Sequence, residues 1–361
     1  MGLGVLSQYG AFLPITRKTP KVTLGEGNTP LIASAHLADE VGCDQVYLKL
    51  EGCNPTGSFK DRGMVVAIAK ALEAKSTTII CASTGNTSAS AAAYGAHCDL
   101  KTIVLVPKGA IATGKLVQAK AYGAQIITVN GNFDQALELV RGISEKHPIT
   151  LVNSLNPYRL HGQKTAAFEV IDALGFTPDY LSIPVGNAGN ISAYWMGFEE
   201  YYKAGLANKK PVMLGFQAED AAPIVNGYPI ENPKTIASAI RIGNPASWKQ
   251  ALVSRDASGG LIETVSDDEI LLAQQFLARR EGVFCEAASA ASIAGILKMS
   301  REGHKLQGKT IVCVITGTGL KEPELAPTHM ESESHEVNAN FEAVEASLNL
   351  IANNVTAGKQ R

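Results

Sequence analysis

The sequence predicts an α/β protein of two domains, each a twisted, mainly parallel sheet with flanking helices. Three observations lead to this fold class. Short β-rich runs alternate with longer helical patterns, and strands spaced by single helices form parallel sheets with right-handed crossovers. The chain has 361 residues, enough for two domains or one large one. With 45% hydrophobic residues, it can also bury a sizeable core.

The alternation runs along most of the chain in two stretches. In the first, β-rich runs lie at 45–51, 77–83, 101–107 and 125–131, and helical patterns follow them at 61–75, 87–96, 114–124 and 133–146. In the second, β-rich runs lie at 180–185, 211–218 and 310–317, with helical patterns at 191–205, 267–282 and 288–303. Each stretch predicts one α/β unit.

No Pro/Ser-rich linker separates the two units, so their boundary follows from the rhythm of the elements. We expect a smaller α/β domain at 46–156 and a larger one formed by 1–45 and 157–326. Residues 327–361 are more polar and predict a C-terminal tail helix without a catalytic role. The irregular segment between about 218 and 260, with four prolines, predicts loops over a site or interface.

Charge and cysteine content exclude several classes of protein. The 32 Lys and Arg nearly balance 34 Asp and Glu, which argues against a nucleic-acid or membrane partner. The six cysteines contain no C-x-x-C pair and the histidines form no cluster, so the sequence supports neither a disulfide framework nor a metal site. A signal peptide and a membrane-spanning run are also missing. We therefore expect a soluble, cytoplasmic protein.

Four strand-to-helix loops contain residues with reactive or anion-binding groups, and the first of them, residues 54–63, contains Lys60. In open α/β sheets ligands bind at the carboxyl ends of the strands, so each strand-to-helix loop can be a wall of a site. If Ser58 caps the following helix, Lys60 lies in its first turn, where the macrodipole disfavours an ammonium. A lowered pKa would suit an amine nucleophile or Schiff-base former. The alternative is a solvated lysine paired with Asp61.

The other three loops suit anions. Residues 83–88 bring hydroxyls, an amide and backbone N–H groups to a helix start and can hold a carboxylate, or simply cap the helix. Residues 186–190 can form a nest for a phosphate, or a tight turn, and match neither the P-loop nor the dinucleotide pattern. Residues 316–321 can be an anion loop, a wall with one useful hydroxyl, or a glycine-rich turn without a ligand.

A further group combines cations with amide and hydroxyl donors: Lys115, Asn153, Ser154 and Arg159. Such a group fits a second phosphate or carboxylate site. Each member could equally be a surface charge or a helix cap.

Several of these segments together resemble a known family. GEGNTPL at 25–31, GSFKDRG around Lys60, STGNT around Asn86 and VGNAGN at 185–190 resemble the fold type II pyridoxal-phosphate enzymes, the group related to the tryptophan synthase β chain. NPYRLHGQKT, GFQAEDAAP, AIRIGNPASW and TGTGLK further along are similar to the threonine synthases of the short bacterial type. One small departure is Thr318, where some relatives have Asn or His.

This resemblance, which covers most of the chain, implies a two-domain fold type II enzyme and a role for each loop. Lys60 would be the catalytic residue and would hold pyridoxal 5'-phosphate through a Schiff base. Asn86 would bind the phenolic oxygen of the ring, Thr316 would face the pyridine nitrogen, and the cofactor phosphate would be bound by Gly186, Asn187, Ala188, Gly189 and Asn190. The substrate carboxylate would be bound by Ser83, Thr84 and Thr87, and the substrate phosphate by Lys115, Asn153, Ser154 and Arg159.

The implied reaction converts O-phospho-L-homoserine and water to L-threonine and phosphate, the last step of threonine biosynthesis. The resemblance implies a carbon–oxygen lyase that acts as a homodimer. Two alternatives stay open. One is a sister enzyme, such as a threonine or serine dehydratase or an O-acylserine sulfhydrylase, and the other is a non-enzymatic phosphometabolite-binding protein that needs neither Lys60 nor a chromophore.

Overall fold

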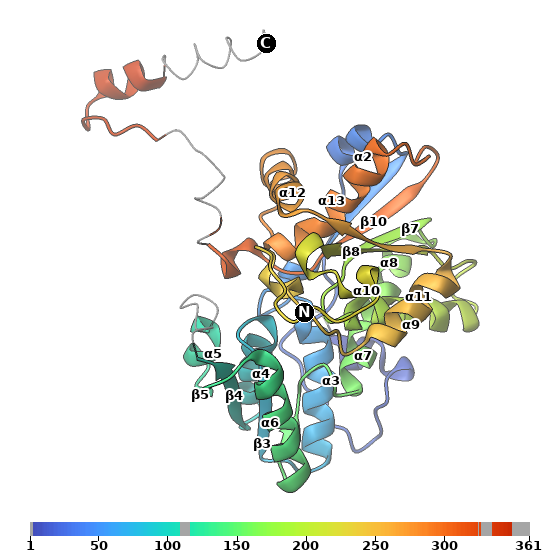
Figure 1. Ribbon diagram of the computed structural model, residues 1–361, viewed down its shortest axis with the longest axis vertical. Helices are drawn as coiled ribbons and strands as arrows, with labels where there is room; N and C mark the ends of the chain where they lie inside the picture. Colours follow the sequence, from blue (N-terminus) through green and yellow to red (C-terminus); the bar gives the residue numbers. More distant parts are fainter. Residues whose placement is uncertain (1–2, 109–115, 324, 326–333, 349–361) are drawn as a thin grey trace. The chain divides into compact units, whose positions relative to one another are not determined.

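The computed structural model describes residues 3–108, 116–323, 325 and 334–348. Residues 1–323 form one compact unit, and residues 324–361 form another. The first unit contains two sheets with helices packed on them, as Figure 1 shows. The predicted α/β class is confirmed.

The larger sheet has six strands in the order β1-β2-β10-β7-β8-β9. β1 runs antiparallel to β2, and the other neighbours are parallel. The strands are β1 (Leu31–Ala33), β2 (Gln45–Leu50), β7 (Tyr180–Pro184), β8 (Val212–Ala218), β9 (Leu261–Val265) and β10 (Thr310–Ile315). Its helices are α2 (Ala35–Val41), α8 (Thr165–Leu174), α9 (Gly189–Lys203), α11 (Trp248–Ser258), α12 (Asp267–Arg280) and α13 (Ala287–Arg301).

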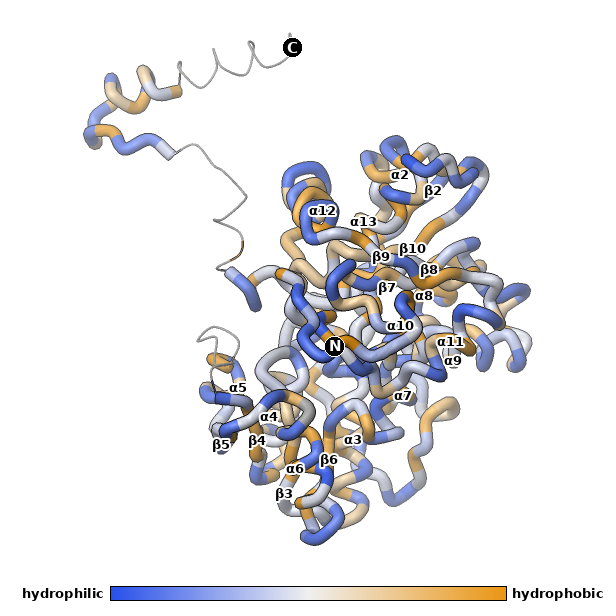
Figure 2. Tube along the Cα trace, in the orientation of Figure 1, coloured by the Kyte–Doolittle hydropathy of each residue, from blue (hydrophilic) through white to orange (hydrophobic). Residues whose placement is uncertain are grey.

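The smaller sheet has four parallel strands in the order β5-β4-β3-β6. They are β3 (Thr78–Ala82), β4 (Lys101–Pro107), β5 (Gln125–Val129) and β6 (Thr150–Leu151). Helices α3 (Lys60–Glu73), α4 (Asn86–His97), α5 (Val117–Ala121) and α6 (Phe133–Lys146) accompany it. Strands of both sheets are hydrophobic stretches between more hydrophilic loops (Figure 2), as expected for parallel sheets covered by helices.

The strand pairing in the two sheets differs from the domain boundaries that the sequence predicts. β2 pairs with β10, so a boundary at residue 46 would cut this strand from its own sheet. Helix α1 (Val5–Gln8) packs Val5 and Leu6 into the core beside the smaller sheet, although we assigned residues 1–45 to the larger domain. The division into two domains stays a proposal, with the smaller one beginning after Leu50.

The predicted tail helix is described in part. Residues 341–348 are helical and residues 334–340 are not, while residues 327–333 and 349–361 of the predicted stretch lie outside the described residues. No helix in the described part of the chain combines the length and the apolarity needed to cross a membrane.

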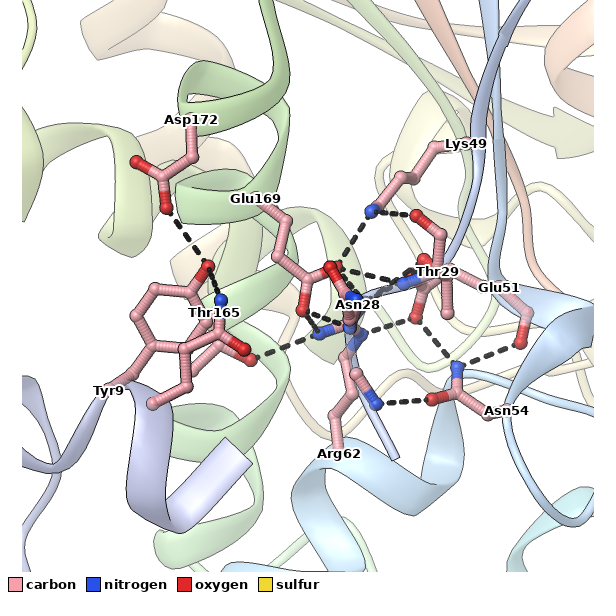
Figure 3. Close-up of polar contacts among 12 residues, drawn as sticks. Tyr9, Asn28, Thr29, Lys49, Glu51, Asn54, Arg62, Thr165, Glu169 and Asp172 are labelled. Carbon is pink, nitrogen blue, oxygen red and sulfur yellow. Dashed lines mark hydrogen bonds and ion pairs between the residues drawn. The ribbon is translucent and has the colours of Figure 1, made fainter. Parts of the chain in front are cut away.

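A buried ionic network joins α3 to β2 and α8 (Figure 3). Arg62 Nε donates to Glu51 Oε2 over 2.6 Å, and Arg62 Nη2 donates to Glu169 Oε2 over 2.6 Å. Lys49 Nζ donates to the same Glu169 oxygen over 2.7 Å. Burial by itself raises the pKa of Glu169, but Arg62 and Lys49 outweigh it and lower the pKa to about 2. The folded protein therefore gains stability from this carboxylate above its ordinary pKa, and loses it as the pH falls toward 2.

We expect Arg62→Ala to lower the free energy of unfolding by about 3–5 kcal/mol, because it leaves Glu51 and Glu169 buried with too little positive charge. Urea denaturation followed by circular dichroism measures the change. The matched control is Arg141→Ala, which removes an exposed pair with Glu145 and should leave the midpoint nearly unchanged. Equal midpoints for Arg62→Ala and the wild type would contradict this account.

Candidate active site

The loops at the carboxyl ends of both sheets line one cavity of about 1030 Å³. Residues 230–231, 233 and 238–244 of the proline-containing segment line it as well, where the sequence predicts loops over a site. The described members of the predicted site all line this cavity: Lys60, Ser83, Thr84, Asn86, Thr87, Asn153, Ser154, Arg159, Gly186, Asn187, Ala188, Gly189, Asn190 and Thr316. Lys115 lies outside the described residues.

Lys60 is the first residue of α3, in the first helical turn as predicted. Its Nζ lies 4.2 Å from the centroid of the Phe59 ring and has no hydrogen-bond partner among the described residues. Burial and, to a smaller extent, the positive charge of Arg159 lower the pKa of Lys60 to about 7, against the opposing effect of Glu286. A large share of this amine is therefore uncharged and nucleophilic at neutral pH.

The predicted cap of this helix is wrong. Phe59, not Ser58, occupies the N-cap position, and no side chain caps the helix. The backbone of Ser58 instead forms a β-bridge with Gly317, and Phe59 N donates to Thr316 O over 3.0 Å. The loop after β10 thus holds the segment that leads into α3, and a tertiary contact does what a local cap would do. The Ser58 hydroxyl is buried without a hydrogen-bond partner.

Asp61 does not pair with Lys60 either. Its Oδ1 accepts hydrogen bonds from Thr56 Oγ1 over 2.7 Å and from Ser90 Oγ over 2.6 Å. Its Oδ2 accepts from the Thr56 N–H over 2.7 Å. Asp61 therefore fixes the shape of the loop around Lys60, and the alternative of a surface lysine paired with Asp61 does not hold.

The GNAGN loop connects β7 to the start of α9. Its left-handed residue is Ala188, with φ 63°, and not one of its glycines. Gly186 is needed for a close approach, because a Cβ there would lie 2.8 Å from the Cα of Ile240. Both polar atoms of the Asn190 side chain are buried and have no hydrogen-bond partner. Such orphaned atoms beside the N-terminus of a long helix fit an anionic group of a ligand.

Glu286 joins two residues of the predicted site. Asn86 Nδ2 donates to Glu286 Oε2 over 2.9 Å, and Thr316 Oγ1 donates to Glu286 Oε1 over 2.9 Å. Burial and the neighbouring Glu322 raise the pKa of Glu286, while these two hydrogen bonds lower it. Our sequence analysis missed Glu286. Its only signal is an acidic residue directly before the Ala- and Ser-rich helix α13, which by itself indicates no chemistry.

Arg159 is a buried cation of this cavity. Its Nη1 donates to Val152 O over 2.8 Å, whereas its Nε has no hydrogen-bond partner. In the described part of the chain no acidic side chain forms an ion pair with it. Burial lowers its pKa to about 10, so the guanidinium is still charged at neutral pH. A buried charge without a counter-ion is costly, and a bound anion would compensate it.

The other described residues that we predict to bind the substrate phosphate, Asn153 and Ser154, already form hydrogen bonds within the protein. Asn153 exchanges two hydrogen bonds of 2.8 Å with the backbone of Ala82, so it fixes the end of β3. Ser154 Oγ accepts from Asn187 Nδ2 over 2.6 Å and thereby links this group to the GNAGN loop. In the carboxylate loop, Ser83 Oγ accepts from the backbone N–H of Gly85 over 3.2 Å.

A second lysine of the cavity, Lys321, was also missed. Burial lowers its pKa, and its Nζ donates to Gln118 Oε1 over 2.6 Å. Nearby, Thr318 Oγ1 accepts from the N–H of Leu320 over 3.4 Å, so the side chain of this residue shapes a turn. Lys321 differs from Lys60 in that its amine is already bound.

The fold and the site together define a class of protein. This is an α/β enzyme with a partly uncharged lysine at the start of a helix, facing one cavity that also contains orphaned anion-binding groups. The residues present fit a phosphorylated carbonyl cofactor, since a free amine can bind an aldehyde and the Asn190 side chain lacks a partner.

Comparison with known families and proteins makes this class specific. Residues 22–317 match the family described as pyridoxal-phosphate dependent enzyme. The threonine synthase of Halalkalibacterium halodurans is 60% identical over 326 residues, which cover 90% of this chain and 91% of that protein. The threonine synthase of Methanocaldococcus jannaschii is 50% identical over 328 residues, covering 88% of this chain and 81% of that protein. The chain belongs to the pyridoxal-phosphate dependent enzymes and, within them, to the threonine synthase family.

Solved structures share the fold at low sequence identity. Maize serine racemase has a TM-score of 0.71 at 22% identity, covering 83% of this chain and 91% of that one. Diaminopropionate ammonia lyase from Escherichia coli has a TM-score of 0.73 at 17% identity, covering 85% and 88%. These structures confirm the predicted fold type II architecture, and the family match confirms the cofactor pyridoxal phosphate.

Proposed function

We propose that this lyase converts O-phospho-L-homoserine and water to L-threonine and inorganic phosphate. Relatives at 50–60% identity over most of the chain carry the name threonine synthase. The observation that carries the substrate assignment is Arg159, a buried guanidinium in the same cavity as Lys60 that has no counter-ion in the described part of the chain. A substrate with a phosphate group supplies the missing anion.

We assign the cofactor to three parts of the cavity. Lys60 would hold its aldehyde carbon, because this amine is partly uncharged and has no hydrogen-bond partner among the described residues. The loop from Gly186 to Asn190 binds its phosphate through the start of α9 and the orphaned Asn190 amide. Asn86 and Thr316 bind polar atoms of the ring, and their present partner Glu286 lies between them.

Pyridoxal phosphate, when bound, supplies an electron sink that lowers the cost of removing protons from the substrate carbons. Lys60 is the base that takes the proton from Cα and then moves protons at Cβ and Cγ. The bond between Cγ and the phosphate oxygen breaks, Cγ gains a proton, and the hydroxyl group of water adds at Cβ. Arg159 and Lys115 hold the phosphate as it leaves, and Ser83, Thr84 and Thr87 hold the carboxylate.

Product analysis tests this function. The protein loaded with pyridoxal phosphate should release phosphate and threonine in equal amounts from O-phospho-L-homoserine, with serine, threonine and homoserine as poor substrates. In water enriched in oxygen-18, the label should enter the threonine hydroxyl and not the phosphate, because the carbon–oxygen bond breaks. A label in phosphate would indicate a phosphatase, and equally fast dehydration of threonine would favour the sister dehydratase.

We also propose that the protein is a homodimer and lies in the cytoplasm. The six cysteines are all free, which supports a reducing compartment such as the cytoplasm. A homodimer is implied by the resemblance, and light scattering tests it. With a net charge of −2, we propose no nucleic-acid partner and no membrane partner.

A further inference from the structure

The Glu286 carboxylate accepts hydrogen bonds from two side chains, Asn86 and Thr316, whose donor groups the cofactor ring would also need. In this structure Thr316 uses its one hydroxyl proton to donate to Glu286 Oε1 over 2.9 Å. The Ser289 hydroxyl lies 2.8 Å from the same Thr316 oxygen and accepts from the N–H of Gly317 over 3.0 Å. Asn86 donates to the other Glu286 oxygen over 2.9 Å and has a second amide proton for another acceptor.

If the Thr316 hydroxyl donates to the ring nitrogen, its oxygen and the facing Glu286 oxygen are left without a proton between them. If the Thr316 proton points to the pyridine nitrogen, Thr316 Oγ1 and an ionised Glu286 Oε1 are both acceptors. Ser289 could donate to Thr316, but this leaves the facing Glu286 oxygen without its hydrogen bond. Only a proton on Glu286 restores a hydrogen bond between them, with Glu286 as the donor.

We propose that Glu286 takes up one proton from solvent when the cofactor ring binds, and that the protonated carboxyl orients Thr316 as a donor to the ring nitrogen. The inference rests on the role proposed above for Thr316. One O–H bond forms on Glu286, nothing leaves, and the Asn86 hydrogen bond to the other carboxyl oxygen persists. Glu286 is thus a positioning residue that acts through Thr316.

The surroundings of Glu286 favour this proton. It is 2% exposed. The nearby carboxylate of Glu322 raises its pKa in the same direction as burial, and Lys321 opposes them. Glu286 in turn raises the pKa of Lys60, and the Cys285 thiol, whose pKa is raised by burial, stays neutral. The carboxyl of Glu286 is the group that accepts the hydrogen bond from Thr316.

Isothermal calorimetry with pyridoxine 5'-phosphate tests the proposal. This probe has no aldehyde, so it leaves Lys60 unreacted. Titrations at pH 8 in buffers of different ionisation enthalpy give the protons taken up per bound probe. The wild type should take up about one proton more than Glu286→Gln, whose amide donates to Thr316 without a proton from solvent. As the pH rises, the wild type should also lose affinity about tenfold per pH unit relative to Glu286→Gln.

Two further variants complete the comparison. Glu322→Gln removes a neighbouring charge but neither of the two hydrogen bonds, so it should keep the extra proton. Thr316→Val removes the hydroxyl that links Glu286 to the ring nitrogen, so this variant should not take up the extra proton. It is the decisive variant if Glu286→Gln does not fold. Equal uptake by the wild type and Glu286→Gln, or an extra proton retained by Thr316→Val, would overturn the proposal. Turnover of O-phospho-L-homoserine, measured separately, distinguishes this failure from failure of the proposed function.

Discussion

Lys60→Ala is expected to keep the fold and to lower turnover of O-phospho-L-homoserine by about a thousandfold or more. The substitution removes both the group that holds the cofactor and the base that moves protons at the substrate carbons. Initial rates of phosphate release measure the loss, and circular dichroism checks the fold. Lys203→Ala, a change at an exposed lysine paired with Glu199, is the matched control and should turn over like the wild type.

Chemical labelling separates Lys60 from the other lysine of the cavity. Borohydride reduction of the loaded protein, followed by peptide mapping, should place the cofactor on Lys60. Lys321 also has a lowered pKa, but its amine is bound to Gln118, so it is the poorer nucleophile. A label on Lys321, Lys115 or any other lysine would show that the assignment is wrong.

Arg159→Ala is expected to lower kcat/KM for O-phospho-L-homoserine by on the order of a hundredfold or more. A guanidinium makes two charge-assisted hydrogen bonds to a phosphate, each worth about 1.5–3 kcal/mol. The cofactor should still be bound to Lys60 and absorb in the visible, because we propose that Arg159 binds the substrate phosphate and not the cofactor. Steady-state kinetics and a spectrum of the same sample measure both effects.

The control for Arg159 is Arg255→Ala, which removes a surface arginine paired with Asp256. It should leave both kcat/KM and the spectrum as in the wild type. Full activity in Arg159→Ala would argue that the substrate has no phosphate, and the dehydratase alternative would replace the proposed function.

Much of the fold could be predicted from the sequence because its elements repeat a local pattern. Residues 103–107, for example, are a continuous apolar run, as buried parallel strands require, and the structure places them in β4 (Lys101–Pro107). β1 and β6 were not predicted, because strands of three and two residues carry too little periodicity. The boundary at residue 46 could not foresee that β2 pairs with β10, because this strand pairing joins residues far apart in the chain.

The loops of the site could be predicted because glycines, hydroxyls and a lysine at strand-to-helix junctions have a chemical meaning of their own. Glu286 and Lys321 could not be predicted in the same way. Glu286 gains its meaning from Asn86 and Thr316, which lie on other elements of the chain. Ser58 failed as a cap because a β-bridge with Gly317 holds its backbone.

The sequence by itself determined the α/β class, the loops that form the cavity and, through its resemblance to a family, the cofactor. Each of these is encoded in short segments whose patterns persist wherever the chain places them. Only the tertiary structure decided that, among the residues it describes, Arg159 has no counter-ion and Lys60 no hydrogen-bond partner, and that Glu286 connects Asn86 to Thr316. Burial and electrostatic partners arise when distant segments meet, so they fix the charge states on which the chemistry depends.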